Sequence, residues 1–339
     1  MKRTSDSTSS SLHPEILVAE GLQKTYGNRL ALRGVSFSLR AGRVLGFLGP
    51  NGAGKTTAIR ILTTILEPDT GSFTIDGISH KRPEMIRRKI GVLPESLGFP
   101  KQITAINYLT YFGQLYGFSA DTAHANAVLL LDEVGLQQRS NSLVGTYSRG
   151  MRQRLGIARS LINSPSVVFL DEPTLGLDPR GQQELLALTQ RIARERNVGV
   201  ILCSHLLVEI EGICDDVVIL NLGQMVASGS VAEVIGNVQR NIALQNNLRI
   251  RVPSADVAKA REVLDGSPCV RSVHIIGESD GVLGVELASV SNGGSSHAYM
   301  LNNKILGTLI KAKVPIINFE TKGNNLQDIF LHLTEEIVE

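Results

Sequence analysis

The stretch Gly49-Pro-Asn-Gly-Ala-Gly-Lys-Thr-Thr57 decides the fold expected for most of this 339-residue chain. It matches the pattern G-x4-G-K-[ST], in which glycines let successive backbone amides turn toward the phosphates of a nucleotide. An apolar run at Val44–Leu48 precedes it, and apolar residues recur at helical spacing from Ala58 to Leu66 after it. A strand, a glycine loop and a helix in this order predict a phosphate-binding loop, because the helix N-terminus adds its positive end to the site.

The residues of this loop have separate expected roles. We expect Lys55 to reach the terminal phosphates and the hydroxyl of Thr56 to bind Mg²⁺. The rest of the loop is expected to surround the phosphates, and consists of Gly49, Pro50, Asn51, Gly52, Ala53, Gly54 and Thr57.

A second motif, Val167-Val-Phe-Leu-Asp171-Glu172, is an apolar strand that ends in two acidic residues. Two adjacent carboxylates at the C-terminal edge of a buried strand need a counter-charge, and downstream of a phosphate loop Mg²⁺ is the natural one. We expect Asp171 to hold the metal, directly or through water, and Glu172 to polarise the water that attacks the γ-phosphate. The combination indicates ATP hydrolysis.

A third motif, Tyr147-Ser-Arg-Gly-Met151, precedes Arg-Gln-Arg-Leu155 and a helix with one apolar face. Ser148 is therefore predicted to be the N-cap of that helix. With these motifs in order, the region from about Leu17 to Gly236 resembles the ATP-binding-cassette (ABC) ATPases. The resemblance implies a signature loop here, usually Leu-Ser-Gly-Gly-Gln, which binds the γ-phosphate of the nucleotide held by a second subunit.

The signature loop departs from the common form in a way that resembles one branch of the family. Ser148 and Gly150 are kept, whereas Tyr147, Arg149 and Met151 differ. This Tyr-Ser-x-Gly-Met-Arg-Gln-Arg form is similar to that of the ATPase subunits of drug, lipid or polysaccharide exporters. Ser148, Arg149 and Gly150 are accordingly expected to contact ATP.

The same resemblance implies roles for four further residues. Tyr26 corresponds to the aromatic residue that stacks on adenine, and His205 to the switch histidine that contacts the γ-phosphate. Glu95, in Val92-Leu-Pro-Glu95, stands where the family usually has a Gln that senses the metal and the interface. Asp178, in Gly176-Leu-Asp178, belongs to the loop between the two nucleotide sites. The alternatives are a core tyrosine for Tyr26 and an ordinary loop histidine for His205.

Composition excludes several other classes. The formal net charge is +2 with no basic stripe, which argues against nucleic acid as the main partner. Cys203, Cys214 and Cys269 lack paired spacing, so reduced thiols are expected. No apolar run approaches the roughly 18 residues of a membrane span. The Ser- and Thr-rich Met1–His13 reads as a disordered tail rather than a signal peptide, which implies the cytosol.

The pattern along the chain predicts two domains. An α/β P-loop NTPase cassette is expected over residues 14–238, with an antiparallel β subdomain and a helical insert at about 96–160. The subdomain begins with strands at Ile16–Leu22 and Val35–Leu39. After a linker at 239–247, residues 248–339 form a small α+β domain in which the elements spell β-α-β-β-α-β, as in ferredoxin-like folds.

This small domain carries no expected chemistry. Its last predicted strand is Val314–Phe319, and a final helix at Leu326–Ile337 caps the sheet or reaches a partner. A dimer-stabilising module, a regulatory domain and a partner-docking surface remain its alternatives, in that order of preference.

The expected function is the ATPase subunit of an ABC transporter. The resemblance implies that two copies, or one copy and a paralogous cassette, form a head-to-tail dimer that traps two Mg-ATP. Closure would drive a separate multispanning permease docked near Glu95–Tyr116, with this chain cytoplasmic and peripheral on the inner face of the cell membrane. A soluble cassette protein acting on translation or DNA is the rival, but it would need two cassettes or long coiled coils. A non-hydrolysing ATP switch is disfavoured by Glu172 and His205.

Overall fold

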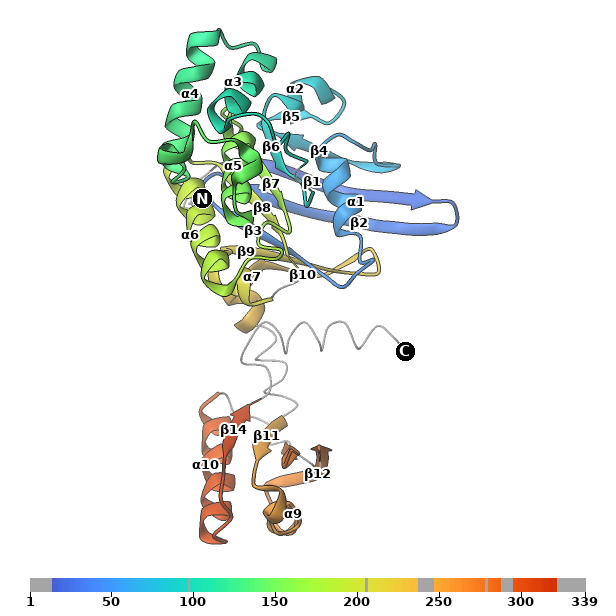
Figure 1. Ribbon diagram of the computed structural model, residues 1–339. Helices are drawn as coiled ribbons and strands as arrows, with labels where there is room; N and C mark the ends of the chain where they lie inside the picture. Colours follow the sequence, from blue (N-terminus) through green and yellow to red (C-terminus); the bar gives the residue numbers. More distant parts are fainter. Residues whose placement is uncertain are drawn as a thin grey trace, which may run out of the picture. The chain divides into compact units, whose positions relative to one another are not determined.

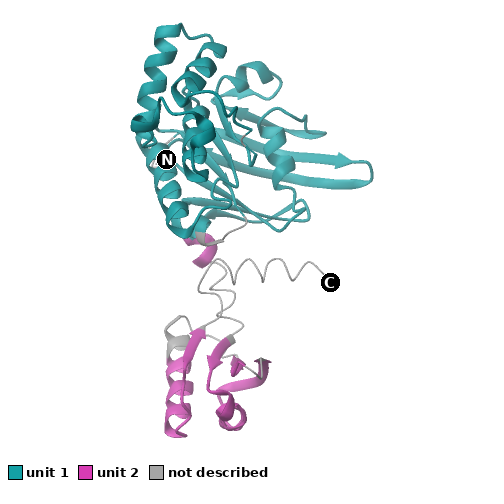
Figure 2. Ribbon diagram, in the orientation of Figure 1, with its two compact units in different colours: residues 1–231 teal, residues 232–339 magenta. Residues whose placement is uncertain are grey.

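The computed structural model describes residues 14–96, 98–204, 207–236, 247–277, 280–287 and 295–321 of the chain. Several expectations fall outside these ranges: the tail at 1–13, the linker residues 239–246, the final helix at 326–337, and His205. The chain divides into two units, residues 1–231 and 232–339 (Figure 2). No helix in the described ranges is long and apolar enough to cross a bilayer.

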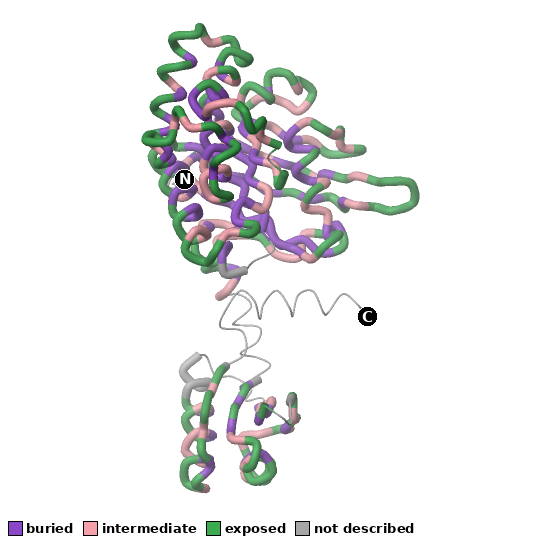
Figure 3. The backbone as a smooth tube through the Cα atoms, in the orientation of Figure 1, coloured by how far each residue is buried: buried purple, intermediate pink, exposed green. Residues whose placement is uncertain are grey.

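The larger sheet of the first unit carries the glycine loop. Its strand order is β10-β9-β3-β8-β7-β6, with β10 antiparallel to β9 and the other neighbours parallel (Figure 1). The strands are β3 (Val44–Leu48), β6 (Ile90–Leu93), β7 (Val167–Asp171), β8 (Gly199–Cys203), β9 (Asp216–Asn221) and β10 (Gln224–Ser230). Both β3 and β8 are buried along their whole length, as Figure 3 shows for the middle of the unit. Burial on both faces explains why these strands are continuous apolar runs in the sequence.

A second, antiparallel sheet packs against β3. Its order is β2-β1-β4-β5, and its strands are β1 (Glu15–Tyr26), β2 (Arg29–Arg40), β4 (Thr70–Ile75) and β5 (Ile78–Ser79). The rings of Phe37 on β2 and Phe47 on β3 meet edge to face, with centroids 5.0 Å apart. The two sheets therefore share one core, and the predicted antiparallel β subdomain is confirmed.

The hairpin formed by β1 and β2 is longer than the sequence predicted. The expected strands ended at Leu22 and began again at Val35, but the ladder continues to the pair Tyr26 and Arg29. Polar residues and shifts of register in this outer half interrupt the apolar alternation that the prediction relied on. The extension matters because it sets Tyr26 and Arg29 at the tip of the hairpin.

The expected helical insert lies between β6 and β7. Its helices α3 (Ala105–Leu115) and α4 (Ala120–Glu133) pack on each other and begin at the side-chain caps Thr104 and Ser119 (Figure 1). The chain returns to β7 through α5 (Arg149–Leu161). The remaining helices of this unit with assigned bounds are α1 (Lys55–Leu62), α2 (Pro83–Arg87), α6 (Pro179–Glu195) and α7 (Leu207–Ile213).

The second unit has the predicted β-α-β-β-α-β order. Its elements are β11 (Asn247–Arg251), α9 (Val257–Asp265), β12 (Val270–Gly277), β13 (Val282–Leu287), α10 (Ser295–Lys311) and β14 (Asn318–Thr321). The sheet order is β12-β13-β11-β14 with antiparallel neighbours, the arrangement of a ferredoxin-like fold. Its core is separate from that of the first unit and gathers apolar residues of the two helices and the sheet, including Leu248, Ile250, Leu264, Leu283, Val285 and Ile305.

One strand of this unit was predicted wrongly. The apolar stretch Val314–Phe319 was expected to be a strand, but β14 begins at Asn318. Lys313 takes the left-handed conformation at φ +53°, and the N–H of Val314 donates to the carbonyl of Leu309 at 3.0 Å. The first residues of the stretch therefore close the C-terminus of α10, and Pro315 has no N–H to offer to a ladder.

Candidate nucleotide site

The glycine loop joins β3 to α1 in a backbone conformation that depends on Gly54. This residue precedes α1 with φ +107°, and a Cβ there would lie 2.7 Å from the carbonyl oxygen of Ala31. No side chain fits at that position without moving the hairpin strand. The turn between β9 and β10 supports the loop, because the N–H of Gly223 donates to the carbonyl of Ala53 at 3.0 Å. The N-terminus of α1 consequently opens into the site.

A cavity of about 640 Å³ lies over this loop and gathers residues from distant parts of the chain. Pro50–Thr57 form its floor, Tyr26 and Arg29 reach it from the hairpin tip, and the ends of β6 and β7 supply acidic residues. Its lining residues are Tyr26, Arg29, Ala31, Pro50, Asn51, Gly52, Ala53, Gly54, Lys55, Thr56, Thr57, Arg60, Glu95, Asp171, Glu172 and Leu175. Tyr26 is 45% exposed, so it is not a core tyrosine.

Lys55 lies across the mouth of the loop. Its Nζ donates hydrogen bonds to the carbonyl oxygens of Gly49 and Pro50, the latter at 3.1 Å. Burial lowers the pKa of Lys55, while the neighbouring Cys203, Glu172 and Asp171 act in the opposite direction. The ammonium group is therefore partly stripped of water and held where phosphate oxygens can replace the two carbonyls as acceptors.

Asp171 and Glu172 follow one another at the C-terminal edge of β7. Burial raises the pKa of Asp171, and the nearby Glu95 carboxylate adds to the effect, whereas Lys55 and Arg60 lower it. Glu172 takes a left-handed backbone conformation at φ +47°, and its N–H donates to the carbonyl of Cys203 on β8 at 2.9 Å. A non-glycine residue in this region costs about 1 kcal/mol or more, which is typical of strain kept at functional sites.

The signature loop lies elsewhere on the same unit. Ser148 caps α5 as predicted, with its Oγ accepting a hydrogen bond from the N–H of Met151 at 3.2 Å. Asp178 precedes α6, whose first residue is Pro179. The nucleotide cavity is not lined by any of the four predicted residues in this region, which the structure describes: Ser148, Arg149, Gly150 and Asp178. The structure thus brings together one half of the predicted site and leaves the other half apart.

Comparison with known proteins places this geometry in a family. The sequence model of the ABC transporter family matches residues 32–175 of this chain. The linearmycin resistance ATP-binding protein LnrL of Bacillus subtilis (strain 168) is 29% identical over 320 residues, covering 94% of this chain and 98% of LnrL. The daunorubicin/doxorubicin resistance ATP-binding protein DrrA of Streptomyces peucetius is 31% identical over 316 residues, covering 93% of this chain and 91% of DrrA. This chain belongs to the ABC transporter ATP-binding proteins.

A solved structure agrees with this assignment. It is the ADP conformation of an ATP-binding cassette of an ABC transporter, and it matches with a TM-score of 0.60 at 25% identity. The match covers 66% of this chain and 94% of that cassette. As an ABC subunit the protein binds ATP and is an ATPase.

The donor set of this ABC ATPase fits Mg²⁺. The oxygens available near the phosphate loop include the Thr56 hydroxyl and the Glu95 and Asp171 carboxylates, which line the same cavity. Within the described ranges there is no group of three or more His, Cys, Asp and Glu side chains arranged to hold a metal alone. Mg²⁺ prefers one or two carboxylates together with nucleotide phosphates, so the arrangement suits a metal that arrives with ATP.

Sequence reasoning missed two cations in the cavity, Arg29 and Arg60. Arg60 lies four residues after Thr56 on α1, and this i, i+4 spacing was the available signal that both face the same side. Arg29 gave no local signal, because its place depends on the long hairpin; its Nη2 lies 3.5 Å from the carbonyl oxygen of Gly52. The ABC site therefore holds more positive charge than Lys55 alone provides.

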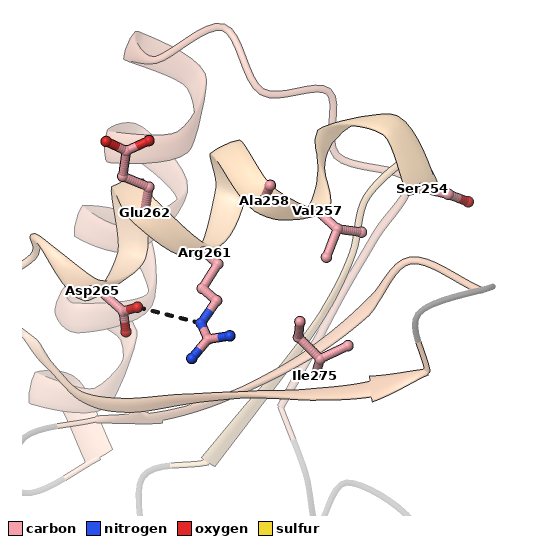
Figure 4. A pocket seen from close by; sticks show the side chains of 7 residues that line it. All are labelled: Ser254, Val257, Ala258, Arg261, Glu262, Asp265 and Ile275. Carbon is pink, nitrogen blue, oxygen red and sulfur yellow. Dashed lines mark ion pairs between the residues drawn. The ribbon is translucent and has the colours of Figure 1, made fainter.

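A second hollow, of about 610 Å³, lies on the other unit between α9 and β12 (Figure 4). Its lining combines the apolar Val257, Ala258 and Ile275 with the polar or charged Ser254, Arg261, Glu262 and Asp265, and Arg261 pairs with Asp265 at 3.5 Å. The hollow lacks a glycine loop and an unpaired cation among its lining residues, so it does not compete as a nucleotide site.

Proposed function

We propose that this ABC ATPase hydrolyses Mg-ATP in sites shared between two copies of the chain, and so drives a separate multispanning permease that exports its substrate. The supporting observation is that the signature loop is absent from the lining of the nucleotide cavity of its own chain. Ser148 and Gly150 line no part of the cavity that their own chain forms. A second copy, or a paralogous cassette, that approaches head to tail would bring its own signature loop to the open side of the cavity.

In this proposal each chain supplies one set of residues to its own nucleotide. Tyr26 stacks on adenine, the loop Gly49–Thr57 surrounds the phosphates, and Lys55 neutralises their terminal oxygens. Thr56, Glu95 and Asp171 hold Mg²⁺, which when bound neutralises charge on the phosphate oxygens. Glu172 orients and polarises the attacking water. His205, which lies outside the described residues, contacts the γ-phosphate.

The partner chain supplies the remaining residues. Its Ser148 hydroxyl and the N–H groups at the start of its α5 are donors suited to the γ-phosphate, because a helix N-terminus favours anions. Its Asp178 belongs to the loop that lies between the two sites. Hydrolysis therefore depends on closure of the pair.

The surface proposed for the permease lies on the helical insert. Tyr111 and Leu115 on α3 are 54% and 63% exposed, and Tyr116 beside them is 44% exposed. Large apolar side chains gathered on one helix face indicate an interaction surface. Beneath them, Arg159 of α5 donates to the hydroxyl of Tyr108 at 3.0 Å and lies 5.6 Å from the ring centroid of Phe112. This contact joins the docking helix to the helix that Ser148 caps.

Export is the direction that the relatives favour. LnrL and DrrA are named as resistance ATP-binding proteins for linearmycin and for daunorubicin/doxorubicin, and both match over more than nine tenths of this chain. We extend to this protein the export of a drug, lipid or polysaccharide, with the chain held at the cytoplasmic face of the membrane by its permease. The cargo itself is selected by the permease.

Purification from membranes tests this function. A tagged chain is isolated from mildly solubilised membranes, and the bound proteins are identified by mass spectrometry. A multispanning protein bound to the wild type and to Leu129→Asp, but lost from Leu115→Asp, supports the proposal. Leu129 is the matched control because it is 65% exposed on α4 of the same insert. Recovery of no multispanning protein with the wild type argues against it.

A further inference from the structure

Arg149 lies directly over Gly176 of the same chain. A Cβ built on Gly176 would lie 2.5 Å from Cζ and Nη1 and 2.9 Å from Nε of Arg149. Three atoms of the planar guanidinium group are thus almost equally close to one point, so its face covers the glycine. A side chain at position 176 would displace it.

Gly176 is suited to this contact in two respects. It lacks a side chain, and its φ of +71° is a conformation that L residues seldom adopt. A second contact lies beside the first, between Gly150 and Leu177: a Cβ on Gly150 would lie 3.8 Å from Cδ2 of Leu177. The start of the signature helix therefore packs on the loop between Glu172 and Asp178 at two adjacent points.

That loop is tied to Glu172 by its own hydrogen bonds. The N–H of Leu175 donates to the carbonyl of Glu172 at 3.2 Å, and the N–H of Leu177 donates to the carbonyl of Thr174 at 3.0 Å. Two consecutive turns leave little slack between Glu172 and Gly176. A shift of Gly176 is therefore transmitted to the backbone of Glu172.

We propose that Arg149 is a positioning residue that links the signature loop to Glu172 within one chain, through the contact of its guanidinium face with Gly176. This deepens the proposed function, since it rests on Glu172 activating water. This role differs from direct binding of Arg149 to the phosphates of the nucleotide held by the second chain. The contact with Gly176 is made by the planar shape of the guanidinium group and not by its charge. When the signature loop engages a nucleotide, its movement reaches Glu172 of its own chain.

A double-mutant cycle on Arg149→Ala and Gly176→Ala tests the link. We expect Arg149→Ala to lower kcat about three- to ten-fold, toward the lower end of the range for residues in direct contact, while KM for ATP stays within about two-fold. Gly176→Ala loses the same contact and adds backbone strain. In the Arg149→Ala background it should therefore cost only the strain, so the double variant is about three- to ten-fold more active than the product of the two single effects.

Arg149→Lys separates packing from charge. A lysine keeps the positive charge but lacks the planar group, so we expect its kcat to match that of Arg149→Ala. Recovery of wild-type kcat in Arg149→Lys overturns the proposal, as do single effects that multiply in the double variant. Arg149 is exposed at the first position of α5, so these variants should melt within about 2 °C of the wild type.

Arg180→Ala is the matched control. This arginine stands at the start of α6, close in sequence to the same loop, and its side chain is 88% exposed in an ion pair with Glu184 at 3.0 Å. Its kcat should equal that of the wild type, and a loss equal to that of Arg149→Ala would contradict a specific contact. If the wild type hydrolyses ATP as a monomer, the proposed site shared between two chains is wrong. The double-mutant cycle can still be interpreted in that case, because Arg149 and Gly176 belong to the same chain.

Discussion

The backbone N–H of Glu172 donates a hydrogen bond to the carbonyl oxygen of Cys203 at 2.9 Å. This bond continues the pairing of β7 with β8 by one residue beyond the strand end, where Glu172 adopts φ +47°. The parallel sheet thereby fixes the backbone of the proposed catalytic carboxylate beside the phosphate loop.

Replacement of that carboxylate tests its role. We expect Glu172→Gln to slow ATP hydrolysis about 10²- to 10⁴-fold, the usual contribution of a general base, because the amide cannot polarise water in the same way. Its affinity for ATP should stay within about two-fold of the wild type. Turnover under saturating ATP and a fluorescent-nucleotide titration measure the two quantities. Glu184→Gln, at an exposed position of α6, should leave both unchanged, and equal losses in the two variants would contradict the assignment.

The lowered pKa of Lys55 predicts how ATP affinity depends on pH. Burial disfavours the charged ammonium in the nucleotide-free protein, whereas bound phosphates favour it, so binding takes up a proton at alkaline pH. Affinity should fall as the pH rises through the lowered pKa of free Lys55, by up to about ten-fold per pH unit. Lys55→Arg stays charged and should show a flatter alkaline profile. Identical profiles for the two proteins would contradict this role.

Asp171→Asn tests whether the buried carboxylate of Asp171 destabilises the nucleotide-free protein, and the melting temperature is the measure. Because burial raises the pKa of Asp171, the folded protein keeps this proton to higher pH than the unfolded chain does. The ionised group therefore destabilises the nucleotide-free protein above the raised pKa; this cost declines as the pH falls below the raised pKa and vanishes below the ordinary pKa of an aspartate. We expect Asp171→Asn to raise the melting temperature at pH 7.5 by about 2 °C and to converge with the wild type in acid.

Asp76→Asn should have the opposite sign. The carboxylate of Asp76 pairs with Lys89 at 2.7 Å, which lowers the pKa of Asp76. Its stabilising contribution is present above its ordinary pKa and is lost in acid, so the substitution should lower the melting temperature at pH 7.5. A lower melting temperature for Asp171→Asn as well would contradict the expected destabilisation by the Asp171 carboxylate.

Arg159, which joins α3 to α5, should also stabilise the folded protein. Its guanidinium group contacts the rings of Phe99 and Phe112 at 5.9 and 5.6 Å and donates to Tyr108 at 3.0 Å. Loss of a cation–π contact and a partly buried hydrogen bond should lower the free energy of unfolding by about 1–3 kcal/mol. Arg159→Ala, measured by urea unfolding against exposed Arg180→Ala, tests this value. An equal stability of the two variants would contradict it.

The sequence predicted those parts of the fold that are determined by residues close together in the chain. The strand, loop and helix around Gly54 were confirmed because glycine spacing and hydrophobic periodicity act within a few residues. The Ser148 cap was confirmed for the same reason. In contrast, Val314 was placed in a strand because its apolar neighbours look alike whether they end a helix or begin a ladder.

The rest depends on contacts between distant segments. Arg29 enters the cavity only because the hairpin continues through polar residues, and Arg149 meets Gly176 only because α5 and the loop after β7 pack together. Neither contact has a pattern in the sequence. In the proposed function the nucleotide site belongs to two chains, which would explain why Ser148 and Lys55 can be identified in one sequence yet line no common cavity in one chain.

The most direct test of this account is sedimentation of Glu172→Gln with and without ATP. Slow hydrolysis should hold the closed pair together, so ATP is predicted to double the mass from that of the monomer, and Ser148→Arg added to the same variant should prevent the doubling. A Glu172→Gln protein that binds ATP tightly and stays monomeric would contradict the shared site.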